Sequence, residues 1–269
     1  MAVILQKRLP VQAGKAFPVS NGMKQTKILM GMPITVEIAD KNAMPENLEK
    51  IFSYFKYVDE KFSTYKESSE ITKINKGKFS ENGWSEDMKE VFRLAEITKK
   101  ETCGYFDIWN GKKYDPSGLV KGWAVYNAAK ILKTDGFSNF YINAGGDIET
   151  RGKNTEGKDW VIGIKNPFNA REIIKTLRLK NKGIATSGTY IRGQHIYNPK
   201  NPGNSLEEII SLTVIGPNVY EADRFATAAF AMEQEGINFI EKTKGLEGYA
   251  IDKNGVATMT SGFEKYVYD

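Results

Sequence analysis

Residues 140–187 read FYINAGGDIETRGKNTEGKDWVIGIKNPFNAREIIKTLRLKNKGIATS, and this stretch decides the fold class. Four short apolar runs follow one another here, separated by glycine, asparagine and charged residues, with no helical pattern between them. A parallel sheet would require strands that alternate strictly with helices, and this stretch lacks that alternation. We therefore predict an α+β fold with mixed or antiparallel sheets, and strands at 140–143, 160–164, 173–179 and 184–187.

Helices and further strands are predicted on both sides of this stretch. Apolar residues recur at helical spacing after Pro45, after Ser85 and from about Leu119 to Lys133. Ser85 is a suitable helix cap, because its hydroxyl can accept a hydrogen bond from a free backbone N–H group. The remaining expected elements are strands at 28–39 and 209–215, helices at 221–232 and 236–244, and a terminal β-hairpin at Asn254-Gly255.

The composition is that of an ordinary globular protein. The 269 residues are 41% hydrophobic and 26% charged, with a single cysteine, Cys103, and a single histidine, His195. These counts exclude a disulfide framework, a cysteine-rich zinc cluster and a multi-histidine metal site, so any metal needs oxygen ligands. Lysine and arginine exceed aspartate and glutamate by 38 to 33. A net charge of +5 suits anionic ligands but is too small to indicate a nucleic-acid-binding protein.

The amino-terminal segment bears on the cellular location and the domain organisation of the protein. No apolar run reaches the roughly 18 residues of a membrane-spanning helix. Residues 1–22 have an apolar patch of only four residues, which precedes Lys7 and Arg8, so they lack the order of charged and apolar regions of a signal peptide. No lipobox cysteine follows, so we expect a cytoplasmic protein. Because Met23 could serve as a start, residues 1–22 are expected to be a natural extension or an added leader. A single compact domain is expected over residues 23–269.

Two glycine-containing clusters are candidate ligand sites. The segment from Asp115 to Trp123 places an acid, a tight turn and a lysine at the start of a predicted helix. A helix N-terminus has free N–H groups and a positive dipole end, so this segment could bind phosphate with Lys121 adding charge. The alternative is a capped helix start with a surface lysine. The segment from Asn143 to Asp147 permits either close approach of a ligand or an ordinary hairpin turn.

Two further clusters carry hydroxyl groups and the histidine. Residues 185–190 surround Gly188 with hydroxyls and lead to His195, which is either a structural or a catalytic residue. Asp223 and Thr227 lie four residues apart, so on a helix their oxygens share one face and could bind one hard cation. The alternative is a first-turn charge and a packed threonine. Tyr65, after an apolar helix, either stacks on a planar ligand or lies at the edge of the core.

Taken in this order, the clusters resemble the ApbE family, the Mg²⁺-dependent FAD:protein FMN transferases. The resemblance spans about Met30 to Met232. Each motif alone is weak, and their order along the chain makes the resemblance specific. Its elements are Met30-Gly31-Met32, Ser63-Thr64-Tyr65, Ser69-Glu70-Ile71, Gly104-Tyr105-Phe106-Asp107, residues 115–122, Asn143-Ala144-Gly145-Gly146-Asp147, residues 186–190, residues 195–199, and Ala222-Asp223 with Thr227.

The resemblance implies an ApbE-like fold and an enzyme that uses FAD as its substrate. Such an enzyme cleaves the FAD pyrophosphate, attaches FMN through a phosphoester to a threonine or serine of an acceptor flavoprotein or reductase subunit, and releases AMP. Two alternatives remain: a FAD pyrophosphatase that gives free FMN and AMP, and a non-catalytic flavin-binding protein. By the resemblance, Met30, Tyr65, Tyr105, Phe106, Asp107, Asp115, Lys121 and Ile196 would line the FAD site, Gly118, Asp223 and Thr227 would bind Mg²⁺, and His195 and Asp223 would be catalytic.

Overall fold

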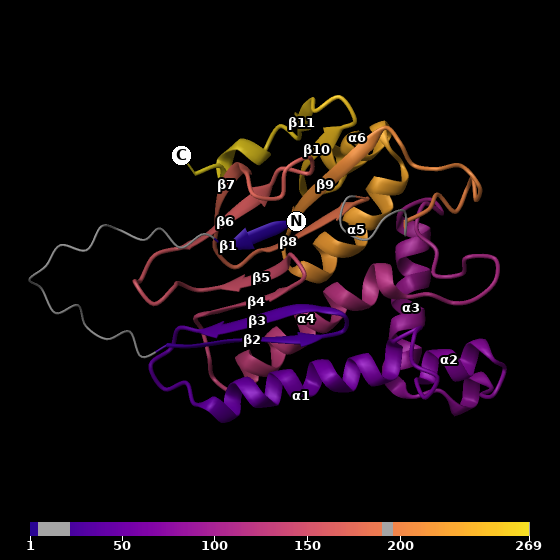
Figure 1. The fold of residues 1–269 in the computed structure, drawn as a ribbon, viewed down its shortest axis with the longest axis horizontal. Helices are drawn as coiled ribbons and strands as arrows, with labels where there is room; N and C mark the ends of the chain where they lie inside the picture. Colours follow the sequence, from indigo (N-terminus) through magenta and orange to yellow (C-terminus); the bar gives the residue numbers. More distant parts are fainter. Residues whose placement is uncertain (5–21, 190–195, 269) are drawn as a thin grey trace, which may run out of the picture.

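The computed structural model describes residues 1–4, 22–189 and 196–268. The described residues form a sheet of eight strands and a sheet of three. Figure 1 shows helices packed along the large sheet and the smaller sheet laid over it. All strand pairs in the described residues are antiparallel, which confirms the predicted fold class. The large sheet has the order β11-β10-β9-β8-β5-β4-β3-β2 and the small sheet has the order β1-β6-β7.

The strands of the large sheet are β2 (Met23–Leu29), β3 (Met32–Ile38), β4 (Phe140–Ala144), β5 (Asp147–Arg151), β8 (Gly183–Gly188), β9 (Ile209–Gly216), β10 (Glu247–Asp252) and β11 (Ala257–Met259). Those of the small sheet are β1 (Ala2–Ile4), β6 (Trp160–Lys165) and β7 (Ile173–Leu179). The helices are α1 (Pro45–Phe62), α2 (Glu70–Asn75), α3 (Glu86–Glu101), α4 (Ser117–Thr134), α5 (Val219–Ala231) and α6 (Gln234–Lys242).

Three apolar clusters hold these layers together. One lies between α1, α4 and strands β3 and β4, and includes Phe55, Leu132 and Ile142. A second lies between α5, α6 and strands β8 to β10. The third lies between the two sheets, where Trp160 and Tyr249 are buried. The large sheet is therefore covered on both faces, so the side chains on both faces of its central strands, β5, β8 and β9, are mostly buried.

Local sequence accounts for most element boundaries. The Ser85 hydroxyl accepts a hydrogen bond from Met88 N at 3.3 Å and caps α3, as predicted. The expected single strand at 28–39 is instead the hairpin β2–β3, because Met30 and Gly31 adopt positive φ angles of 53° and 71° and reverse the chain. Strand β5 and helix α2 were not predicted, and β5 escaped notice because it carries polar residues at buried positions.

The beginning of the chain belongs to the small sheet. Residues 2–4, which the sequence placed in the leader segment, form β1 and pair with β6. Ala2 is fully buried between the two sheets. The boundary expected at Met23 therefore does not separate these residues from the folded structure. Among the described residues, no helix is long and apolar enough to cross a membrane.

Candidate functional site

A cavity of about 150 Å³ lies where helices α4 and α5 meet the ends of strands β4 and β8. One wall comes from the loop between α3 and α4, and another from the segment that follows residue 195. These segments are far apart in sequence, so the cavity is a product of the tertiary fold. Most of the predicted site residues line it, namely Tyr105, Phe106, Asp107, Asp115, Gly118, Lys121, Ile196, Asp223 and Thr227.

Two glycines allow α4 and α5 to approach closely at the cavity. A Cβ atom on Gly122 would lie 2.6 Å from Asp223 Cβ, so a larger residue would push the helices apart. The N–H of Gly122 instead donates to Asp223 Oδ2 at 2.7 Å. One turn earlier on α4, the carbonyl of Gly118 accepts a hydrogen bond from Thr227 Oγ1 of α5 at 3.2 Å. The two contacts bring a carboxylate, a hydroxyl and a backbone carbonyl to one side of the cavity.

Lys121 lies between two buried carboxylates. Its Nζ atom is 2.5 Å from Asp147 Oδ2 and 3.8 Å from Asp223 Oδ1, while Asp147 and Asp223 are 1% and 3% exposed. Burial raises the pKa of Asp223 to about 8; repulsion from Asp147 adds to this rise and the Lys121 charge opposes it. A cation held by Asp223 would favour its ionised form, so this carboxylate is suited to a positively charged ligand.

The donor set around Asp223 fits a hard divalent cation. A carboxylate, a hydroxyl and a carbonyl are the oxygen ligands that Mg²⁺ prefers, and they leave further positions for water or for substrate phosphates. Within the ranges the structure describes, no three acidic, histidine or cysteine side chains cluster as metal ligands. A site here would therefore combine Asp223 with the neutral oxygens of Thr227 and Gly118. Asp147 supplies a second carboxylate beside Asp223, and Lys121 contacts both.

The start of α4 also presents backbone groups to the cavity. Asp115 Oδ1 accepts a hydrogen bond from Ser117 N at 3.1 Å, which shapes the turn into the helix. Ser117 and Gly118 line the cavity in the first turn of α4. The positive dipole end at this helix start and the nearby Lys121 ammonium favour an anionic group. This arrangement agrees with the phosphate-site interpretation of the 115–123 segment.

The opposite wall is held by Tyr197. Its hydroxyl is 3.0 Å from the carbonyl oxygens of both Asp107 and Trp109, to which it can donate. Burial raises the pKa of Tyr197 to about 12, so the hydroxyl stays protonated and remains a donor. Lys200 places its ammonium 4.5 Å from the ring centroid of Tyr105. These contacts order the rim of the cavity on the side of residues 105–109.

Two predicted site residues, Met30 and Tyr65, do not line the cavity, and a third lies outside the described residues. Met30 lies in the β2–β3 turn and packs against the cluster under α1 and α4. Tyr65 follows α1 and is 95% exposed, so it does not lie at the edge of the core. It does not line the cavity either. His195 lies outside the described residues.

Sequence reasoning missed several residues that the structure brings to the cavity. Tyr197 and Ser187 belong to clusters that the sequence singled out, but neither was assigned a role. Asp147, which does not line the cavity but pairs with Lys121 beside it, ends the double-glycine segment, and its acidic side chain after two glycines was the available signal. Asn110 lines the cavity without any local signal, because its position depends on how the α3–α4 loop folds back.

Comparison with known proteins gives a consistent result. The model of the ApbE family matches residues 30–115 and 110–250. A FAD:protein FMN transferase from Haemophilus influenzae is 30% identical over 164 residues, which are 56% of this chain and 47% of that protein. A second, from Klebsiella pneumoniae, is 29% identical over 150 residues, which are 52% of this chain and 43% of that protein. The matches thus cover slightly less than half of these curated relatives.

Solved structures extend the likeness over nearly the whole chain. The flavin transferase ApbE from Vibrio cholerae superimposes with a TM-score of 0.81 at 22% identity, over 91% of this chain and 99% of that one. The ApbE protein from Thermotoga maritima gives a TM-score of 0.80 at 22% identity, over 92% of this chain and 100% of that one. At this level of identity the likeness shows the fold, and it confirms the predicted architecture.

Proposed function

This chain belongs to the ApbE family, and from that premise we propose that it transfers FMN from FAD to a hydroxyl group of a partner protein. The acceptor would be a threonine or serine of a flavoprotein or reductase subunit, and AMP would be released. The observation that carries the proposal is the convergence of Asp223, Thr227 and the Gly118 carbonyl beside Lys121 at the start of α4. Relatives named FAD:protein FMN transferase support it.

The residues of the cavity have distinct roles in this proposal. Asp223, Thr227 and the Gly118 carbonyl would hold Mg²⁺, whose chemistry is neutralisation of the charge that develops on the pyrophosphate. Lys121 and the first turn of α4 bind the phosphates and orient them. The wall formed by Tyr105, Phe106 and Asp107, together with Asp115 and Ile196, covers the rest of FAD.

The transfer step needs only FAD and the acceptor hydroxyl as reactants. The acceptor hydroxyl oxygen attacks the phosphorus atom of the FMN half, the bond from that phosphorus to the bridging oxygen breaks, and AMP leaves with that oxygen. His195 is the proposed base that takes the hydroxyl proton, a role that suits the ordinary imidazole pKa of about 6.5. Positioning of the two reacting atoms supplies most of the remaining rate enhancement.

One experiment decides among the possible activities. The protein is mixed with FAD, Mg²⁺ and a candidate acceptor, and the intact mass of the acceptor is measured together with the AMP formed. An acceptor that gains one FMN for each AMP supports the proposal. AMP together with free FMN and an unchanged acceptor would indicate a pyrophosphatase, and bound FAD without AMP would indicate a carrier protein.

The Asp223→Asn substitution tests the metal site within this assay. The asparagine keeps the shape of the side chain but removes the charge that would hold Mg²⁺, so we expect AMP formation to fall by about 100-fold or more. Thr227→Val should lower the rate less, because it removes a neutral ligand. Asp159→Asn is a matched control, since Asp159 does not line the cavity. Undiminished AMP formation by the Asp223→Asn variant in Mg²⁺ would show that the metal binds elsewhere.

A further inference from the structure

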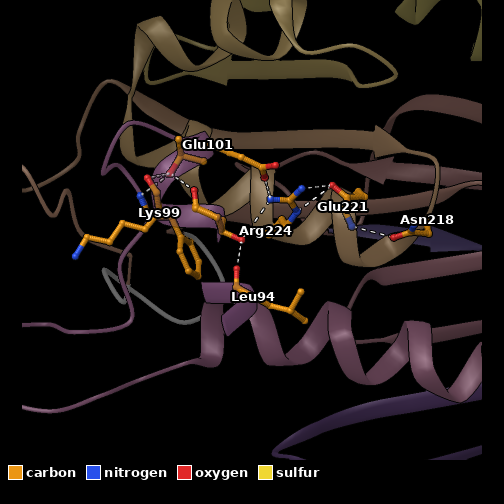
Figure 2. Close-up of polar contacts among 9 residues, drawn as sticks. Leu94, Lys99, Glu101, Asn218, Glu221 and Arg224 are labelled. Carbon is orange, nitrogen blue, oxygen red and sulfur yellow. Dashed lines mark hydrogen bonds and ion pairs between the residues drawn. The ribbon is translucent and has the colours of Figure 1, made fainter. Parts of the chain in front are cut away.

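Arg224 follows Asp223 directly on α5 and joins that helix to the end of α3 (Figure 2). Its side chain is only 7% exposed. Within α5, its Nε and Nη2 atoms donate to Glu221 Oε2 at 2.9 Å and 2.5 Å. Towards α3, its Nη1 atom donates to Glu101 Oε2 and to Thr98 Oγ1, the latter at 3.3 Å. The guanidinium therefore bonds to both helices at once.

A chain of hydrogen bonds continues from this contact to the cavity wall. Thr98 Oγ1 accepts a hydrogen bond from Arg224, and its hydroxyl donates one to the carbonyl of Leu94 at 2.8 Å. Thr102 Oγ1 donates a hydrogen bond to the carbonyl of Thr98 at 2.7 Å. Thr102 Oγ1 also accepts a hydrogen bond from the N–H of Phe106 at 3.2 Å. Phe106 lines the cavity, so Arg224 is connected to the cavity backbone through two threonines.

The segment that these bonds reach, residues 102–107, is called here the α3 turn. It leaves the helix through Cys103 and Gly104, whose φ angles of 51° and 84° reverse the backbone sharply. A second contact ties it back to the helix, because Lys99 Nζ lies 2.6 Å from Asp107 Oδ2. The α3 turn is thus built on the last turn of α3, and its position follows that of the helix end.

One further side-chain hydrogen bond between the two helices, that of Tyr220 on α5 with Thr98 on α3, supports the Arg224 contact among the described residues. Helix α5 packs extensively on α4, β8 and β9, whereas the backbones of α3 and α5 approach each other only sparsely. The planar guanidinium bonds several acceptors in a fixed geometry, which a lysine cannot reproduce. The charge of Arg224 is offset by Glu221 and Glu101, and the Asp223 pKa is set by burial, Asp147, Lys121 and Gly122. Arg224 therefore affects the cavity through the position of the α3 turn and not through its charge.

We propose that Arg224 is a positioning residue that holds the α3 turn against α5. It thereby sets the distance across the cavity between Phe106 of the α3 turn and Asp223 of α5. Its consequence for ligand binding rests on the proposed function, in which the cavity ligand is FAD. Its consequence for the α3 turn is a property of the protein alone, and it can be measured without flavin.

The test compares four variants by hydrogen–deuterium exchange and by FAD titration, well below the melting temperature of each. Arg224→Lys keeps the positive charge but loses the planar guanidinium that bonds both helices. Glu101→Ala removes the carboxylate acceptor at the end of α3. In both, we expect the amides of residues 102–107 to exchange about tenfold faster and the Kd for FAD to rise about tenfold. The matched controls are Glu96→Ala, an exposed residue of α3, and Arg178→Lys, an exposed residue stacked on Tyr268. Both controls should match the parent.

Each result supports or overturns the proposal. Parental exchange rates at 102–107 in both Arg224→Lys and Glu101→Ala would overturn it, even if these variants melt at lower temperature, because a purely structural role predicts lower stability alone. Faster exchange with an unchanged Kd would overturn the claim that the α3 turn sets the cavity for its ligand. Failure of the proposed function is seen separately, in a parent protein that forms no FMN-bearing acceptor.

Discussion

Lys121 and its two carboxylates decide the charge of the cavity at the scale of single residues. A buried carboxylate ionises easily only beside a positive charge, and the Lys121 ammonium lies closer to Asp147 than to Asp223. Asp223 Oδ2 is already used by the N–H of Gly122, whereas its Oδ1 is the oxygen nearer to Lys121. In the proposed reaction, Asp223 would exchange these partners for a divalent cation when the cation and the substrate phosphates bind.

His195→Ala is expected to remove FMN transfer and to leave FAD binding nearly unchanged. A base on the acceptor side contributes to the transition state and little to ground-state affinity, and its loss typically lowers the rate by about 10²–10⁴-fold. The measurement combines the transfer rate, the Kd for FAD and the melting temperature. A lower melting temperature with unchanged turnover per folded molecule would instead identify a structural histidine.

Tyr65→Ala is expected to weaken FAD binding by about one to two decades without changing the melting temperature. Tyr65 is 95% exposed, so its ring contributes almost nothing to the core. Stacking of an aromatic side chain on a planar base is worth about 1–3 kcal/mol, which corresponds to that loss of affinity. Tyr65→Phe should bind like the parent. A fluorescence titration in which Tyr65→Ala binds FAD with parental affinity would exclude the stacking role.

Helix α5 is the element on which the site depends. Its N-terminus is fixed by Asn218, which caps it through Glu221 N at 3.0 Å, and by Glu149 of β5, which accepts from Val219 N at 2.7 Å. The glycines of α4 allow the next turn to approach closely. Asp223 therefore occupies a position that is set from three sides by the helix cap, strand β5 and helix α4.

Glu149 should make the stability of the protein depend on pH. It is fully buried, and burial raises its pKa from 4.5 to about 7. Between these values the folded state keeps a proton that the unfolded state releases, so stability falls as pH rises from about 4.5 to 7, by about 3 kcal/mol in all. Glu149→Gln should remove this contribution from the slope of stability against pH in urea unfolding curves measured across that window, and the contribution of Asp223, whose pKa is also raised by burial, should remain.

A matched variant isolates the effect of burial on this slope. Glu156 is exposed, so Glu156→Gln should retain the slope of the parent. The glutamine at position 149 still offers a carbonyl to Val219 N, and the start of α5 should stay intact. Equal slopes for the parent and Glu149→Gln would show that Glu149 does not carry the pH dependence.

The whole molecule consists of three layers, and the cavity lies at the ends of the strands where the helical layer meets the large sheet. The small sheet covers the other face, and none of its described residues lines the cavity. Its contribution is burial of apolar surface, with Trp160 2% exposed and its ring centroid 5.0 Å from that of Tyr141. Stability and ligand binding are thus assigned to different faces of one sheet.

Trp160→Ala tests this division of roles. Removal of a buried tryptophan usually costs about 3–5 kcal/mol, and here it also removes the hydrogen bond from Nε1 to the carbonyl of Arg151. We expect a loss of that size in urea unfolding, with a parental Kd for FAD in the folded protein. Phe168→Ala, at a 57% exposed residue, should cost less than about 1 kcal/mol. A weakened Kd in Trp160→Ala would contradict the separation.

The sequence by itself determined the α+β class, helices α1, α3, α4 and α5, and most of the strands. These elements follow from apolar periodicity and caps such as Ser85, which act over a few residues. It also determined that a metal needs oxygen ligands, because one histidine and one cysteine leave no other donor set. Asp223 and Thr227 were identified as partners because both lie on one helix.

Only the tertiary structure decided which polar groups meet across elements. The contact of Asp223 with Gly122 N joins residues 101 positions apart, and that of Arg224 with Thr98 joins residues 126 positions apart. Strand β5 was missed for the same reason, since its buried Asp147 and Glu149 find their partners on α4 and α5. Apolar burial is non-directional and is therefore encoded as a local pattern, whereas a buried polar group needs a specific distant partner, which only the complete fold supplies.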